Sequence, residues 1–117
     1  MELRTRRAYD KLARGDGRRI LVDRMWPRGV KKADADIDYW ARDAAPSPEL
    51  RKWFGHEPAR WGEFRRRYFR ELDANPEALA ALREAMSGAS RVTLVYAARD
   101  ERCNNAVALA EYLNAND

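Results

Sequence analysis

Two short runs of consecutive apolar residues predict the centre of a sheet. The first is residues 20–22, within the stretch RILVDR, and the second lies within residues 91–98, which read RVTLVYAA. A strand that is buried on one face alternates apolar and polar residues, whereas an uninterrupted run rich in β-branched residues is typical of a strand covered on both faces. We therefore expect both segments to be central strands of a mostly parallel sheet.

Between these two strands the apolar residues recur at helical spacing. In the stretch SPELRKWFG, Ser47 is suited to the N-cap of a helix, Pro48 to its first turn and Gly55 to the position just past its end. A second helix is expected after Pro58. Its apolar side chains, which return every three or four residues and form one face, are Trp61, Phe64, Tyr68 and Leu72.

Two further helices and two weaker strands complete the pattern. One helix follows Asn75, and the last runs from about residue 102 to residue 114. Their predicted buried side chains are Leu79, Leu82 and Met86 in the first, and Ala106, Leu109, Ala110 and Leu113 in the second. Residues 3–10 are a weaker first strand, and the alternation around Tyr39 favours a short strand or an irregular edge. The fold class that follows is α/β, one compact domain spanning residues 1–117 with a small, mostly parallel sheet and about four flanking helices.

Composition places the chain among globular proteins. Of its 117 residues 45% are hydrophobic and 36% charged, and a single cysteine rules out a disulfide within the chain. No apolar run reaches the roughly 20 residues of a membrane span, and the first residues lack the apolar core of a signal peptide. We expect a cytoplasmic protein with no membrane partner. The sequence gives no indication of the oligomeric state.

The charge is modest, but its chemistry is distinctive. The net charge is +4, and 19 of the 23 basic residues are arginines, whose planar guanidinium group suits phosphate and carboxylate ligands. In open parallel sheets, ligands bind outside the carboxyl ends of the strands. The two segments that leave the predicted central strands there carry Asp23, Arg24, Arg28, Arg99 and Asp100. With the N-terminus of the last helix, these arginines predict an anion site.

Several neighbours complete the predicted site. In LVDRMWPRG, Pro27 stiffens the chain and Gly29 allows it to turn back, so that Trp26 either stacks on a ligand or anchors the loop. The other expected ligand-binding residues are Trp53, Tyr96 and Asn104. The candidates for proton transfer are His56, the only histidine, and Asp23.

Cys103 is a third catalytic candidate, because a thiolate is favoured near the N-terminus of a helix. A cysteine-phosphatase function is poorly supported, since residue 109 is leucine where the phosphate loop of those enzymes needs arginine. One histidine and one cysteine without paired spacing do not make a zinc site. The glycine-rich phosphate-loop patterns are also missing, and we predict no metal and no cofactor.

Three blocks of the chain resemble one family. RILVDRMWPRGVKK, APSPELRKWFGHEPARWGEFRRRYFREL and VTLVYAARDERCNNAVALAEYL together are similar to domain of unknown function 488, in its short YeaO-like branch. The resemblance covers the chain from about Arg6 to Leu113, and it implies no particular activity. It does imply that a histidine often stands where this chain has Cys103, so that a role built on that histidine would here fall to a thiol or be lost.

Two functions remain open from the sequence. The first is a small enzyme or binding protein for an anionic small molecule, such as a phosphate ester or a nucleotide. The alternative is a nucleic-acid-binding or regulatory module that uses the arginine-rich helix face formed by Arg65, Arg66, Arg67 and Arg70. Glu63 and Glu71 lie beside these arginines and favour an ordinary solvated face.

Overall fold

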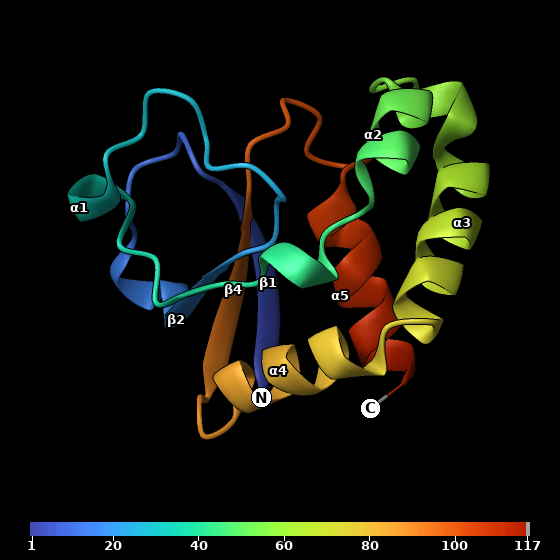
Figure 1. The fold of residues 1–117 in the computed structure, drawn as a ribbon. Helices are drawn as coiled ribbons and strands as arrows, with labels where there is room; N and C mark the ends of the chain where they lie inside the picture. Colours follow the sequence, from blue (N-terminus) through green and yellow to red (C-terminus); the bar gives the residue numbers. More distant parts are fainter. Residues whose placement is uncertain (117) are drawn as a thin grey trace.

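The computed structural model, which describes residues 1–116, is built on a four-stranded parallel sheet (Figure 1). Its strands are β1 (Glu2–Arg7), β2 (Arg18–Leu21), β3 (Tyr39–Trp40) and β4 (Arg91–Tyr96), in the order β1-β4-β2-β3. The predicted neighbours β2 and β4 thus lie side by side at the centre, and the weak first strand and the short strand at Tyr39 form the two edges. The predicted α/β fold class is confirmed.

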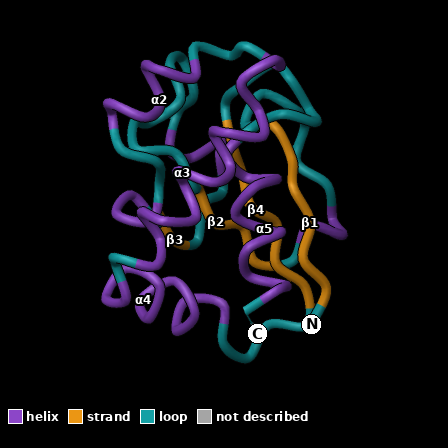
Figure 2. Tube along the Cα trace, turned by 90° about the vertical axis from the view of Figure 1, so that its right-hand side faces the viewer, coloured by secondary structure: helices purple, strands orange, loops and turns teal. Residues whose placement is uncertain are grey.

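Between residues 1 and 116 five α-helices accompany the strands. They are α1 (Lys32–Ala35), α2 (Pro48–Phe54), α3 (Trp61–Asp73), α4 (Pro76–Met86) and α5 (Asn105–Ala115). Helix α1 follows β2, α2 to α4 lie between β3 and β4, and α5 follows β4. Ser47 caps α2 by accepting a hydrogen bond from the Leu50 amide at 3.1 Å, and Gly55 ends this helix in the left-handed conformation with φ 54°, as its sequence signals predict. Figure 2 shows α5 in front of β4, with α3 and α4 beside it.

The main core lies between the sheet and helices α2 to α5. Alternate residues of β4 point to this side, and Ile20 and Val22 join them from β2 and the residue that follows it. The apolar face of α3 supplies Phe64, Tyr68 and Leu72, all buried as predicted. Tyr68 also donates its hydroxyl to the Ala44 carbonyl at 2.6 Å, which ties α3 to the segment before α2.

The opposite face of the sheet is covered as well, and it encloses a buried ion pair. Arg19 and Asp16 are each only 3% exposed, and the Arg19 Nη1 atom lies 2.6 Å from the Asp16 Oδ2 atom. The Arg19 Nε atom donates to the Ala35 carbonyl of α1 at 3.1 Å. Thr93 of β4 is fixed to the same layer, because its hydroxyl donates to the Asp16 carbonyl at 2.6 Å. The central strands are therefore buried on both faces, as the consecutive apolar and β-branched residues of their sequences indicate.

The start of the last helix differs from the prediction. The α5 helix begins at Asn105 rather than near residue 102. Asp100 explains the difference, because its Oδ1 atom accepts the amides of Arg102 and Cys103 at 2.8 and 2.9 Å and holds this stretch in a capped turn. Asn104 then caps the helix through the Val107 amide at 2.9 Å. Several backbone amides that we expected to bind an anion are thus already hydrogen-bonded to side chains of the protein.

None of the helices between residues 1 and 116 is long and apolar enough to cross a membrane.

Candidate functional site

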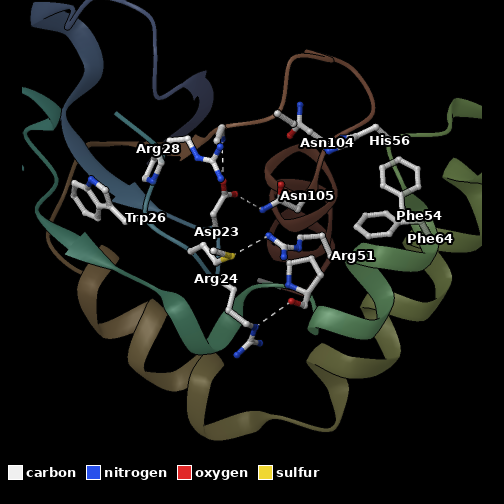
Figure 3. A pocket seen from close by; sticks show the side chains of 15 residues that line it. Asp23, Arg24, Trp26, Arg28, Arg51, Phe54, His56, Phe64, Asn104 and Asn105 are labelled. Carbon is white, nitrogen blue, oxygen red and sulfur yellow. Dashed lines mark hydrogen bonds between the residues drawn. The ribbon is translucent and has the colours of Figure 1, made fainter. Parts of the chain in front are cut away.

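A cavity of about 510 Å³ lies at the carboxyl ends of β2 and β4 (Figure 3). Its walls come from the segment after β2, from α2 and α3, from the residues after β4 and from the start of α5. The lining residues are Asp23, Arg24, Met25, Trp26, Pro27, Arg28, Pro46, Arg51, Phe54, His56, Phe64, Ala97, Ala98, Asn104 and Asn105. The volume is in the range of pockets that hold small molecules.

Asp23 is the only carboxylate among the lining residues. Its Oδ2 atom accepts the Ala97 amide at 2.9 Å, and its Oδ1 atom accepts the Asn105 side-chain amide, also at 2.9 Å. The Asn105 amide is shared with the Val22 carbonyl at 2.9 Å. Asp23 thus joins the ends of both central strands to α5, and none of the ion pairs between described residues includes it.

Burial raises the pKa of Asp23 above its ordinary value of 3.8, because a desolvated carboxylate is costly to ionise. The hydrogen bonds from Asn105 and Ala97 oppose this rise, as do the charges of Arg51 and His56. The folded protein consequently holds the Asp23 proton more tightly than the unfolded chain does.

We expect this proton to give Asp23 an unusual pH signature. Since its folded pKa is raised, the stability that Asp23 contributes is present in full below pH 3.8 and is lost as the pH rises through the folded pKa. An Asp23→Asn variant should therefore be most destabilised relative to wild type in acid, and less so at neutral pH. Urea unfolding of both proteins between pH 4 and pH 7.5 measures this difference. A destabilisation that instead grows toward neutral pH would show that Asp23 is stabilised as a carboxylate.

Two arginines of the cavity have no carboxylate partner. Arg28 and Arg51 are exposed, and the ion pairs of the described residues include neither. Within residues 1–116, the only side-chain hydrogen bond of Arg51 is a weak one to the Met25 sulfur at 3.5 Å. Both guanidinium groups therefore keep donors free for a ligand.

Arg24 lines the same cavity, but its guanidinium group is engaged. Its Nε atom donates to the Pro46 carbonyl at 3.2 Å, and its Nη2 atom donates to the Ala45 carbonyl at 3.0 Å. In Figure 3 the side chain runs away from Asp23 toward these carbonyls. Arg24 thus ties the segment after β2 to the residues that precede α2.

Aromatic side chains form the walls at two sides of the cavity. Trp26 donates its indole N–H to the Val30 carbonyl at 2.6 Å and packs edge-on against Trp40, with the ring centroids 5.5 Å apart. Phe54 and Phe64 stack on each other with a centroid separation of 4.4 Å. In Figure 3 Trp26 and this phenylalanine pair appear on opposite sides of Asp23.

His56 lies at the exposed end of the cavity with its backbone in the left-handed region, at φ 59°. Histidine adopts this conformation more readily than most residues, although it remains uncommon. Gly55, the residue before it, also has a left-handed backbone and ends α2. These two successive left-handed residues turn the chain and bring the imidazole to the cavity.

Other expected site residues lie outside the lining: Gly29, Trp53, Tyr96, Arg99, Asp100 and Cys103. Trp53 lies against two arginines instead, with the Arg67 guanidinium carbon 4.2 Å and that of Arg60 5.5 Å from its ring centroid. Asn104 does line the cavity, but its side chain already bonds the Val107 amide and the Asp100 carbonyl. The roles of these residues in binding stay predictions.

The surroundings of Cys103 do not favour the expected thiolate, and its catalytic role stays a prediction. Burial and the negative charge of Asp100 raise the pKa of this thiol, so the neutral form is favoured. The capped turn contributes to this rise after burial, because it places the Asp100 carboxylate beside Cys103. Within residues 1–116, no group of three or more histidine, cysteine, aspartate or glutamate side chains is placed to hold a metal ion.

Arg51 is the main lining residue that sequence reasoning missed. It lies on α2 three residues before the buried Phe54, so both side chains face the same way. The available signal was this spacing, since a helix that buries Phe54 beside the strand ends also directs Arg51 toward them. Phe64 was expected in the core, and it forms a cavity wall at the same time.

Comparison with known proteins places this architecture in a family. Residues 2–116 match the model described as the inactive DUF488-N3 subclade. The chain belongs to this family of domain of unknown function 488. A protein of Mycobacterium tuberculosis, Rv3073c, is 45% identical over 112 residues, which cover 96% of this chain and 93% of the relative. YeaO of Escherichia coli is 38% identical over 115 residues, which cover 98% of this chain and 99% of the relative.

Both relatives carry the description "uncharacterized protein", and no solved structure matches the chain significantly. The resemblance to the YeaO-like branch is confirmed by these matches.

Proposed function

We propose that this DUF488-N3 protein binds a small anionic molecule, with a phosphate or phosphate-like group, in the cavity at the carboxyl ends of β2 and β4. The observation that carries the proposal is the pair of arginines, Arg28 and Arg51, that border the cavity without carboxylate partners. Guanidinium groups that face a concave apolar site bind phosphate or carboxylate through charge-assisted hydrogen bonds. His56 lies at the same cavity and adds a further donor.

Binding without turnover fits the chemistry of the lining better than catalysis does. The described lining includes no serine, threonine, cysteine or lysine side chain that could act as a nucleophile. The Asp23 carboxylate already accepts hydrogen bonds from two donors, the Ala97 amide and the Asn105 side chain. The word "inactive" in the description of the family agrees with a binding role.

The arginine-rich face of α3 supports the nucleic-acid alternative less well. Glu63 accepts hydrogen bonds from Arg66 and Arg67, both at 3.0 Å, and lies 3.9 Å from Arg70. Arg65 pairs with Glu111 of α5. A phosphate backbone would have to compete with these carboxylates, whereas Arg28 and Arg51 need no such exchange.

Substitution of Arg51 tests the proposal. Pyrophosphate should bind the wild-type protein, and Arg51→Gln should weaken binding about tenfold, equivalent to about 1.4 kcal/mol, because one charge-assisted contact is lost. Isothermal titration calorimetry in low salt measures both affinities. Since Arg51 is exposed, the variant should unfold at nearly the wild-type temperature.

Arg70→Gln is the matched control, because Arg70 is an exposed arginine of α3 outside the cavity lining. It removes the same charge and should leave pyrophosphate affinity unchanged. Equal losses in both variants would mean that the anion responds only to net charge, and no binding to the wild type would refute the proposed function.

A further inference from the structure

We infer that this cavity binds a nucleoside monophosphate and that Asp23 selects it. The flat base of this ligand donates an N–H group to Asp23, and its phosphate is held by Arg51 and Arg28. The inference rests on the proposed function and specifies its ligand class. It starts from a feature that an anion site alone does not explain, namely a carboxylate among arginines that it does not pair with.

Asp23 has acceptor capacity that the described protein atoms do not use. Each carboxylate oxygen can accept about two hydrogen bonds, and each accepts only one here, from Asn105 or from Ala97. Because Asp23 is half-buried and lines the cavity, a ligand donor can reach it and use the remaining capacity. An acceptor with unused capacity increases the affinity for a ligand that brings an N–H group and lowers the affinity for one that does not.

The charged and titratable groups around Asp23 indicate where the phosphate and the base of the ligand lie. Arg51 on α2 exerts a positive field on Asp23, and His56 after it adds to this field when protonated. Tyr68 of α3 lies within electrostatic reach of Asp23, and Arg24 is bound to carbonyls. The positive groups that face the cavity thus lie on the α2 side and at Arg28. A phosphate is drawn to them, and the uncharged end of the ligand is left for Asp23.

The walls suit a flat ring. Trp26 is held by its bond to Val30 and by its edge-on contact with Trp40, so its ring is oriented before any ligand arrives. Phe54 and Phe64 supply a second aromatic wall. Stacking of a base on an aromatic side chain is favourable for any base and needs little rearrangement here.

Replacement of Asp23 should shift two affinities in opposite directions. Asp23→Asn removes a negative charge close to Arg51, so a simple anion should bind more tightly. The same substitution replaces one acceptor oxygen by an NH₂ group, so a ligand that donates to this position should bind less tightly. A purely structural role for Asp23 would lower both affinities together.

The experiment compares ligands that differ by one donor. Adenosine 5′-monophosphate carries an amino group on its ring, whereas purine riboside 5′-monophosphate has the same phosphate and ribose but no N–H on the ring. Calorimetry at pH 7.5 should show about tenfold tighter binding of the adenosine compound by wild type. In Asp23→Asn this preference should largely disappear, while inorganic phosphate binds more tightly than to wild type. Guanosine 5′-monophosphate, whose base carries a ring N–H and an amino group, tests the same preference with a second base.

The outcomes separate this inference from the proposed function. If inorganic phosphate or pyrophosphate binds in an Arg51-dependent way but neither nucleotide is preferred over purine riboside 5′-monophosphate, the inference is refuted and the anion site stands. A preference that survives in Asp23→Asn also refutes it. Circular dichroism checks the fold of the variant, and Asp23→Ser, which keeps an oxygen near the Ala97 amide, replaces it if Asp23→Asn does not fold. If no anion binds wild type, both proposals are wrong.

Discussion

The Asp16→Ala variant should lose about 3–5 kcal/mol of unfolding free energy, because it leaves the buried Arg19 guanidinium without its carboxylate. Asp16 and Arg19 are each 3% exposed, and their side chains meet at 2.6 Å. The Ala35 carbonyl remains as a partner of Arg19, but a neutral oxygen does not compensate a buried charge. A loss of this size is a large share of the roughly 5–15 kcal/mol that stabilises a typical domain.

Urea unfolding at pH 7.5 measures the loss, and Glu2→Ala is the matched control. Glu2 also pairs with arginines, at 2.7 Å to Arg4 and 2.8 Å to Arg91, but its side chain is 47% exposed. Exposed pairs contribute about 0–1 kcal/mol, so this control should change stability little. The double variant Asp16→Leu/Arg19→Met should recover much of the loss by removing both charges. Similar stabilities for Asp16→Ala and Glu2→Ala would contradict the expected importance of burial.

The elements that the sequence predicted well are those with strong local causes. Ser47, Pro48 and Gly55 begin and end α2 through backbone chemistry that involves only neighbouring residues. The β-branched and apolar residues of β4 likewise need no knowledge of their partners to indicate burial on both faces. The start of α5 was misplaced because the Asp100 side chain competes locally for the amides that a helix would have left free.

The candidate site was harder to predict because identical residue types have different partners in space. Arg24 and Arg28 are four residues apart in one loop, yet the first is engaged by carbonyls more than twenty residues away and the second is free of carboxylates. The stretch ARGDGRR reads only as a turn, although it supplies the buried pair of Asp16 and Arg19. The role of each of these side chains depends on its partners in the folded structure, and a local sequence pattern does not predict these partners.

The contrast between Arg24 and Arg28 gives the second large effect. We expect Arg24→Gln to lose about 2–3 kcal/mol of unfolding free energy. Hydrogen bonds from a charged donor contribute about 1.5–3 kcal/mol, and in this variant the Ala45 and Pro46 carbonyls each lose such a bond. Ala45 and Pro46, which carry these carbonyls, are buried. Arg28→Gln should change stability by less than about 0.5 kcal/mol, because its exposed side chain has no such partners.

Ligand affinity should reverse the order of the two variants. Arg28→Gln removes a free guanidinium from the cavity and should weaken pyrophosphate binding several-fold, whereas folded Arg24→Gln should bind nearly as wild type does. Arg24→Lys sharpens the comparison, since lysine keeps the charge but lacks the planar fork that spans two carbonyls, and its stability should therefore stay well below that of wild type. Urea unfolding and calorimetry on the same preparations give both quantities. If Arg24→Gln is as stable as wild type but no longer binds pyrophosphate, Arg24 is a ligand-binding residue, and the carbonyl contacts that join the segment after β2 to α2 give way when the anion arrives.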